Sequence, residues 1–203
     1  PIETGVNLKL YNPAKKYETP GDMQDIPRPI IGYMGTINST RLDGDLLYQI
    51  ISQRPDYNFV FTGPEDDGFR QHRIHSLKNA YFTGQKKVDE LPAYITAYDV
   101  CINPQMVNDI TDGNYPLKID EYLAMGKPTV ATSTHTMRNI FADHTHLATN
   151  LGEWLSAIDR AVTEADDKEL AKQRIAFAET HSWGHSVKKI YGIIDNFLKE
   201  KAT

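Results

Sequence analysis

Several protein classes are excluded by what this sequence has little of. Its 203 residues include one cysteine, Cys101, which excludes an internal disulfide and a cysteine-rich metal site. No apolar run approaches the roughly 18 residues that a membrane-spanning helix requires, so no membrane span is expected. A single reduced thiol fits the cytoplasm, which is the location we expect. Membrane association through a part of the protein beyond this chain is the alternative.

Excess positive charge is also lacking. The chain has 22 Lys and Arg against 27 Asp and Glu, and its net charge at pH 7 is -5. Nucleic acid is therefore not an expected partner, because a phosphate backbone attracts a basic surface. Hydrophobic content of 40% and charged content of 24% are ordinary for one globular domain with a buried core.

The chain divides into three parts. It begins at Pro1 without an initiator methionine, a basic leader or a hydrophobic signal core, so we expect it to be a piece of a longer protein. Residues 1–28 are polar and interrupted by prolines, which predicts a lead-in or interdomain segment. Residues 29–180 are the predicted Rossmann-like domain. Residues 181–203 predict a C-terminal helix that packs on this domain or crosses from it.

Short apolar runs alternate with amphipathic stretches between residues 29 and 180. Continuous apolar strands separated by helices are typical of a parallel sheet covered on both faces. The predicted fold class is therefore α/β, a Rossmann-like parallel sheet with helices on both faces and further C-terminal helices. Strands are expected at 29–34, 57–61, 80–82, 100–103 and 128–132. Helices are expected near 46–51, 68–78, 91–98, 116–125, 154–162, 168–179 and 187–198.

Each predicted strand ends in small or polar residues. In open α/β sheets, ligands bind at the carboxyl ends of the strands. One crevice is therefore expected to be surrounded by Gly35-Thr36, Gly63-Pro64, Gly84-Gln85, Asn103-Pro104 and residues 111–121.

The predicted helix over 116–125 is the most informative element. Asn114 is expected to cap it, Pro116 to occupy its first turn and Gly126 to end it. Its apolar positions, Ile119, Tyr122 and Leu123, predict the face that packs on the sheet.

Lys118 and Glu121 are three residues apart, so they lie side by side on this helix. A lysine beside a helix start can hold an anion, and a carboxylate can accept hydrogen bonds from two hydroxyls. A phosphorylated, diol-bearing ligand is one interpretation. The other is a surface ion pair worth under about 1 kcal/mol, which spacing alone favours.

Other ligand motifs are incomplete. Gly32-x-x-Gly35 lacks the third glycine of a dinucleotide fingerprint, and no Walker motif for ATP is present. The pair His72/His75 and the run Asp143–His146 have spacings that can chelate a metal. Neither has a fixed third ligand, so solvated loop histidines are the favoured interpretation and no metal site is expected.

Seven stretches, taken in order, resemble the C-terminal domain of a GT-B glycosyltransferase of the group-1 (family 4) type. The resemblance extends from Gly5 to about Leu198, and its most specific block is Pro116-Leu-Lys-Ile-Asp-Glu-Tyr-Leu-Ala-Met-Gly-Lys-Pro128. The other stretches are Gly5-Val-Asn7, Ile31-Gly-Tyr-Met-Gly35, Phe61-Thr-Gly-Pro64, Tyr81-Phe-Thr-Gly-Gln85, Leu91-Pro-Ala-Tyr94 and Tyr98-Asp-Val-Cys-Ile-Asn-Pro104.

The resemblance implies transfer of a sugar from a nucleotide diphosphate to an acceptor hydroxyl, usually with retention and without an essential metal or cofactor. Lys118 would contact the pyrophosphate and Glu121 the ribose hydroxyls. Gln85 and Lys86 would meet the nucleobase, largely through backbone groups, while glycine turns and helix-start amides would approach the phosphates. The implied donor-binding set is Gly35, Thr36, Gly63, Gln85, Lys86, Asn114, Tyr115, Pro116, Leu117, Lys118 and Glu121.

The sequence departs from the family pattern in two places. Many relatives carry a second glutamate eight positions before Glu121, where this chain has Gly113, and Asp112 is the candidate substitute. Many also carry an Arg and a Lys in the first loop, where only Arg41 is basic. The sequence therefore does not determine which sugar the donor carries or which residues bind its phosphates.

The family's N-terminal acceptor domain is missing from this chain and is its expected partner, together with a nucleotide-sugar donor such as a UDP- or GDP-sugar. Catalytic groups and most of the acceptor site are expected in that domain, so this piece should bind donor and turn it over poorly or not at all. A sugar-nucleotide epimerase-like domain and a non-enzymatic nucleotide-binding module are the alternatives.

Overall fold

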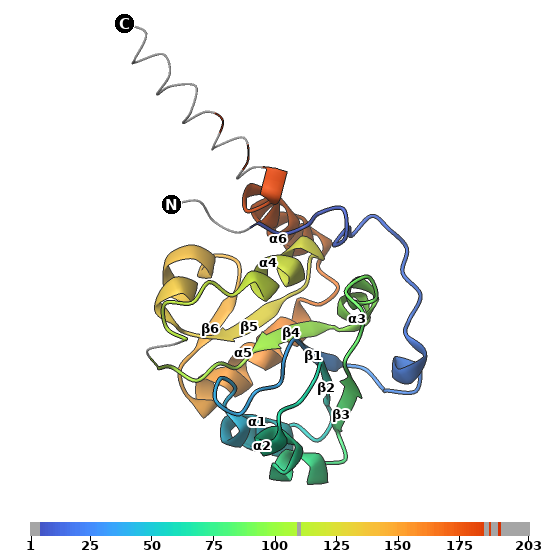
Figure 1. The fold of residues 1–203 in the computed structure, drawn as a ribbon, viewed down its shortest axis with the longest axis vertical. Coiled ribbons are helices and arrows are strands. Elements are labelled where there is room, and N and C mark those ends of the chain that lie inside the picture. Colours follow the sequence, from blue (N-terminus) through green and yellow to red (C-terminus); the bar gives the residue numbers. More distant parts are fainter. Residues whose placement is uncertain (1–4, 109–110, 185–186, 188–190, 192–203) are drawn as a thin grey trace, which may run out of the picture.

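A six-stranded sheet with the order β3-β2-β1-β4-β5-β6 forms the centre of the molecule (Figure 1). The computed structural model describes residues 5–108, 111–184, 187 and 191. All neighbouring strands are parallel. Strand order reverses between β1 and β4, which makes their carboxyl ends a topological switch point. The strands are β1 Ile30–Met34, β2 Asn58–Thr62, β3 Ala80–Gly84, β4 Val100–Asn103, β5 Thr129–Thr132 and β6 His146–Ala148.

Helices cover both faces of the sheet and divide the core into two layers (Figure 1). Cys101 packs into one layer and Ile102 into the other, because successive strand residues point to opposite faces. The α-helices are α1 Gly44–Ser52, α2 Asp67–Arg70, α3 Leu91–Ala97, α4 Leu117–Ala124, α5 Leu151–Thr163 and α6 Lys168–Thr180. Shorter turns are η1 Gly21–Met23, η2 Arg73–Ser76 and the π-helical η3 Met137–Phe141. The predicted fold class is confirmed.

The predicted helix 68–78 is wrong as one element. Asp66 caps α2 through the Phe69 N–H, and His72 caps η2 through the Ile74 N–H. Two caps within seven residues divide the segment into two short turns, because each cap residue has a non-helical backbone. Strand β6 and η3 were not predicted, since a three-residue strand gives no period to detect. The predicted helix over 187–198 lies outside the described residues, apart from isolated positions.

The start of α4 corrects a second prediction. Pro116, rather than Asn114, is the N-cap residue, and no side chain caps this helix. The Ile119 N–H donates to the Pro116 carbonyl at 2.8 Å, which makes Pro116 the first carbonyl of the helix. The end of α4 is as predicted, because Gly126 follows with a φ of +72° that favours glycine.

The lead-in segment packs against the domain rather than standing apart from it. Val6 forms an isolated parallel bridge with Ser182, and its N–H donates to the His181 carbonyl at 3.0 Å. Figure 1 shows the lead-in starting beside α6 and α4 and then passing the α3 side of the sheet before it enters β1. Tyr11 and Met23 are buried in the core on the way. Among the described helices, none is long and apolar enough to cross a membrane.

Candidate functional site

Glycine turns follow strands β1 and β2 at the carboxyl edge of the sheet. The Gly35 N–H donates to the Thr62 carbonyl at 2.9 Å, and the Gly63 N–H donates to the Gly84 carbonyl at 3.0 Å. A Cβ at Gly63 would lie 2.0 Å from the Gly35 carbonyl oxygen. No side chain fits between these backbones, so the turns after the three strands pack against one another and form one backbone surface.

Lys118 reaches from the first turn of α4 onto this surface. Its Nζ donates to the Tyr33 hydroxyl at 2.7 Å and lies 4.1 Å from the centroid of the Tyr33 ring. A Cβ at Gly35 would lie 2.8 Å from the same Nζ, so only a glycine at this position leaves room for the ammonium. The Tyr33 hydroxyl in turn donates to the Thr36 carbonyl at 3.0 Å. The structure therefore brings together Lys118, Gly35 and Thr36, as expected.

The alternative interpretation of Lys118 as a surface ion-pair partner is wrong. Among the ion pairs of the described residues, none joins Lys118 to Glu121. Both side chains are half-buried on the carboxyl side of the sheet. A positive group at the switch point between β1 and β4 is an electrostatic environment that suits an anion.

Glu121 is held in a partly desolvated position. Burial raises the pKa of its carboxyl group to about 7, while the Tyr11 hydroxyl and the Lys118 charge act in the opposite direction. Near neutral pH the group therefore changes between a carboxylic acid and a carboxylate. A desolvated carboxylate is stabilised when hydroxyl donors reach it, which is what a sugar diol would offer.

A buried carboxylate that the sequence did not indicate contacts residues before α4 and after α6. Asp120 is 0% exposed, and its Oδ2 accepts from the Tyr115 hydroxyl at 2.5 Å. Its Oδ1 lies 3.2 Å from Nδ1 of His181, which follows α6. The hydrogen bond to Asp120 holds the side chain of Tyr115, a predicted site residue, just before α4 begins. The only signal in the sequence was an acidic residue next to the apolar stripe of α4.

The two residues predicted to contact the nucleobase, Gln85 and Lys86, have different surroundings in the structure. Gln85 is exposed at the end of β3. The Lys86 ammonium instead pairs with Asp22 Oδ2 at 2.7 Å and lies 5.2 Å from the Tyr94 ring centroid. Its hydrogen bond to Asp22 raises the pKa of Lys86. Lys86 is therefore left with its backbone groups for a ligand.

The loop before α4 has no glutamate to replace the one expected eight positions before Glu121. Gly113 is exposed, and open space surrounds the position of a Cβ there. Oδ1 of Asp112 accepts from the His135 N–H at 2.7 Å. Asp112 is thus used to anchor the segment that leads into η3. Asn114 is exposed at the same loop.

Two buried polar atoms without partners lie at the same edge. Asn103 Oδ1 ends β4 and Thr132 Oγ1 ends β5, and neither has a hydrogen-bond partner in the described part of the chain. Both residues are more than nine-tenths buried. Buried polar atoms are normally paired, so unpaired ones at a ligand edge indicate places where a bound molecule or water contributes. The sequence had placed both residues at strand ends but had not included Thr132 in the crevice.

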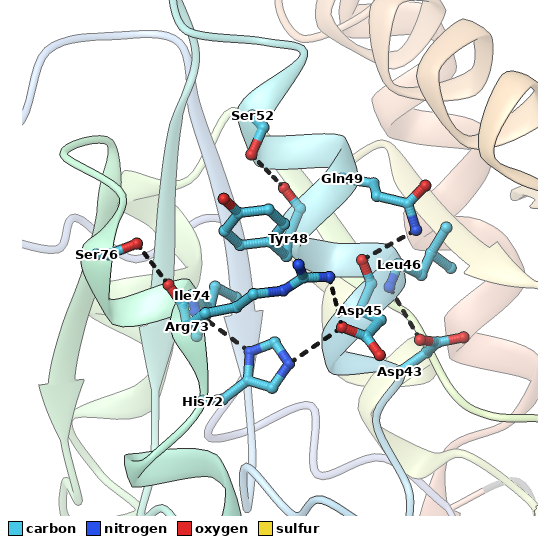
Figure 2. Close-up of polar contacts among 10 residues, drawn as sticks. All are labelled: Asp43, Asp45, Leu46, Tyr48, Gln49, Ser52, His72, Arg73, Ile74 and Ser76. Atoms are coloured by element: carbon cyan, nitrogen blue, oxygen red, sulfur yellow. Dashed lines mark hydrogen bonds and ion pairs between the residues drawn. The ribbon is translucent and has the colours of Figure 1, made fainter.

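The histidines considered as metal ligands have other partners. Figure 2 shows His72 between α1 and η2, where its Nδ1 accepts from the Ile74 N–H at 3.2 Å and its Nε2 lies 3.6 Å from Asp45. Arg73 binds the same Asp45 at 2.8 Å and covers the Tyr48 ring (Figure 2). This cluster therefore ties η2 to α1.

The other candidate histidines also have contacts within the protein. His75 pairs with Glu65 at 2.9 Å, and His146 pairs with Glu164 at 3.0 Å. The His144 ring stacks on Phe177 with centroids 4.1 Å apart. Over residues 5–108 and 111–184, no three metal-ligating side chains of His, Cys, Asp or Glu converge.

A cavity of about 750 Å³ lies between β6, α5 and α6. His146, Glu164 and Arg174 line it, and an ion pair of 2.5 Å joins the last two. None of its lining residues belongs to the predicted donor-binding set. The carboxyl edge of the sheet, with its glycine turns and Lys118, remains the candidate site.

Comparisons with known proteins agree with this geometry. Residues 28–173 match the family model described as glycosyl transferases group 1. The chain is 26% identical over 196 residues to TuaH of Bacillus subtilis (strain 168), whose name marks it as a candidate glycosyltransferase of teichuronic acid biosynthesis. That match covers 93% of this chain and 49% of TuaH, so the chain spans about half the length of the curated relative.

Solved structures share the fold. HepE of Anabaena, solved in complex with UDP, superposes with a TM-score of 0.74 at 14% identity, over 95% of this chain and 56% of HepE. Sucrose-phosphate synthase of Thermosynechococcus elongatus gives a TM-score of 0.73 at 20% identity, over 98% of this chain and 52% of that protein. Both matches cover about half of the longer chain.

Proposed function

The chain belongs to the group 1 family of glycosyl transferases, and from that premise we propose that it is the half of such an enzyme that binds the nucleotide-sugar donor. The proposal assigns binding of the acceptor to the other half of such an enzyme, and the chain spans only 49% of the length of TuaH. The transferred sugar passes from a nucleotide diphosphate to an acceptor hydroxyl.

The position of Lys118 carries this proposal. Its ammonium lies beside the Gly35 turn, at the switch point where parallel sheets bind ligands. The Gly35 and Gly63 turns approach each other closely because neither residue carries a Cβ. A diphosphate matches the position of Lys118 because this lysine balances its charge and can donate to its oxygens.

Glu121 is the residue that binds the ribose of the donor in this proposal. It lies one turn deeper on α4 than Lys118, which places a carboxylate beside the sugar attached to the phosphates. The ribose diol donates two hydrogen bonds to it. UDP is the first nucleotide to test, because the similar fold of HepE was solved with UDP.

The chemistry that this half supplies is stabilisation of the leaving group. When the bond between the sugar and the diphosphate breaks, negative charge grows on the phosphate oxygens. Lys118 and the positive end of the α4 helix dipole stabilise that charge without an essential metal. Retention at the anomeric carbon is part of the proposal. By itself the chain is expected to bind donor and to transfer sugar slowly or not at all.

A thermal-shift and calorimetry panel with UDP, GDP and ADP tests the proposal. At least one nucleotide is expected to raise the melting temperature of the chain, and Lys118→Ala should weaken its binding by about tenfold or more, as loss of a charged hydrogen bond does. The matched control is Lys172→Ala, which removes the same charge from an exposed site on α6. No response to any nucleotide, or equal losses in the two variants, would contradict the proposal.

A further inference from the structure

One side-chain hydrogen bond closes the start of α4 on itself. The Tyr115 hydroxyl donates to Asp120 Oδ2 at 2.5 Å, across five positions of the chain. Lys118 lies between these two residues, in the first turn of the helix. Among the described residues, no side chain caps α4 at its N-cap residue Pro116. The bond between Tyr115 and Asp120 therefore holds the first turn in place of a cap.

Both oxygens of the Asp120 carboxylate have partners. Oδ2 accepts from Tyr115, and Oδ1 lies 3.2 Å from Nδ1 of His181, which follows α6. The Asp120 side chain is 0% exposed, and a carboxylate buried this deeply requires hydrogen bonds. With a partner on each oxygen the carboxylate is held in one orientation, so the Tyr115 hydroxyl has a fixed acceptor.

Aromatic packing holds the two partners of Asp120. The His181 ring lies edge-on to Phe177 and Phe141, with centroids 4.6 Å and 5.9 Å away. The Tyr115 ring packs on the same Phe141, with centroids 5.6 Å apart. Phe141 belongs to η3 and is buried. Side chains from α6, η3 and the segment after α6 therefore keep Tyr115 and Asp120 in their relative positions.

We propose that Asp120 is a positioning residue for the diphosphate of the donor, acting through Tyr115 and the turn that carries Lys118. Asp120 itself is fully buried and does not touch the ligand. Its bond to Tyr115 keeps the backbone of residues 115–120 in one conformation, which holds Lys118 where the phosphates meet it. The inference rests on the proposed function, because it requires that Lys118 bind the diphosphate.

The preference for a nucleoside diphosphate over its monophosphate measures this positioning. The two probes share the base, the ribose and one phosphate, and they differ in the second phosphate. A smaller folded fraction weakens the binding of both probes by the same factor, so it cancels in the ratio of their Kd values. Displacement of Lys118 does not cancel, because the diphosphate carries more charge for the ammonium to balance.

Calorimetry at pH 7 on the 203-residue chain measures both Kd values. The probes are whichever of UDP, GDP and ADP binds best and the corresponding monophosphate. Tyr115→Phe keeps the ring on Phe141 and removes only the hydroxyl, and the diphosphate preference should fall about three- to tenfold, the effect of one net hydrogen bond. Asp120→Asn keeps the shape of the side chain but replaces one acceptor oxygen with a donor, and it should lower the preference similarly.

The double variant Tyr115→Phe/Asp120→Asn separates this bond from a direct contact between Tyr115 and the ligand. If both residues act through one bond, the double variant should lose no more of the preference than the larger single loss. Single losses that multiply in the double variant would overturn the proposal. If Asp120→Asn does not fold, His181→Phe takes its place, because it removes the partner of Oδ1 and keeps a ring against Phe177.

Tyr94→Phe is the matched control. The Tyr94 hydroxyl also donates to a carboxylate, that of Asp22 at 2.8 Å, but it does so from α3. This variant should keep the diphosphate preference of the unaltered chain. If Tyr94→Phe lowers the preference as much as Tyr115→Phe does, the effect is a general loosening of the domain, and the proposal is overturned.

The remaining outcomes separate the inference from the proposed function. If Lys118→Ala removes the diphosphate preference but Tyr115→Phe leaves it unchanged, Asp120 has no positioning role and the proposed function stands. If the unaltered chain and Lys118→Ala show the same preference, Lys118 does not hold the diphosphate and both assignments fail. Absence of nucleotide binding overturns the proposed function itself.

Discussion

Lys118 and Tyr33 form the contact that places a positive charge at the carboxyl edge of the sheet. The lysine Nζ is 2.7 Å from the tyrosine hydroxyl and 4.1 Å from the centroid of its ring. Tyr33 belongs to β1, and Lys118 lies in the first turn of α4, 85 positions later. Tyr33 of β1, a strand at the switch point, thus holds the ammonium of Lys118 on α4 in place.

Tyr33→Phe tests whether this contact prepares Lys118 for a phosphate. The substitution removes the acceptor of Lys118 and the donor to the Thr36 carbonyl, but it keeps the aromatic ring. Affinity for a nucleoside diphosphate should fall about three- to tenfold, less than in Lys118→Ala, because the charge remains. Calorimetry measures it. Tyr48→Phe on α1 is the control, and a loss of affinity there as large as in Tyr33→Phe would contradict the assignment.

Gly63→Ala should destabilise the domain by about 2–4 kcal/mol. The added Cβ would lie 2.0 Å from the Gly35 carbonyl oxygen, and Gly63 has a φ of +149° that disfavours other residues. Urea unfolding at pH 7 measures the free energy. Gly113→Ala is the matched control, since a Cβ there meets nothing within 4 Å. Similar losses in the two variants would show that the close approach of the turns does not require glycine.

Glu121→Gln should change the pH dependence of stability. The pKa of Glu121 is raised from 4.5 to about 7 in the folded chain, mainly by burial. Between these values the folded state binds more protons than the unfolded state, so stability falls as pH rises through this window, by roughly 3 kcal/mol. Glutamine removes that loss.

Urea unfolding at pH 5 and pH 8 checks this expectation. On going from pH 5 to pH 8, the variant should gain stability relative to the unaltered chain. Glu169→Gln at an exposed site of α6 is the control and should show no such gain. A stability difference for Glu121→Gln that is the same at both pH values would mean that burial does not raise its pKa.

The candidate site was partly predictable because two of its features are local. Spacing along one helix places Lys118 and Glu121 on the same side of α4. The glycines after β1 and β2 mark turns at the strand ends, and this prediction is confirmed by the positive φ of Gly35 and Gly63. Their assignment to a donor nucleotide remains a prediction. The cap at Asn114 was wrong because the backbone at Pro116, rather than side-chain type, decides where α4 begins.

The sequence by itself determined the α/β class, the covered parallel sheet and the apolar face of α4, since these follow from short-range periodicity and burial. Tertiary structure alone decided which distant groups meet. Tyr33 meets Lys118 and His181 meets Asp120 across long separations in the chain. The physical reason is that a hydrogen bond depends on distances of about 3 Å between atoms, and only the packed core brings such distant residues that close.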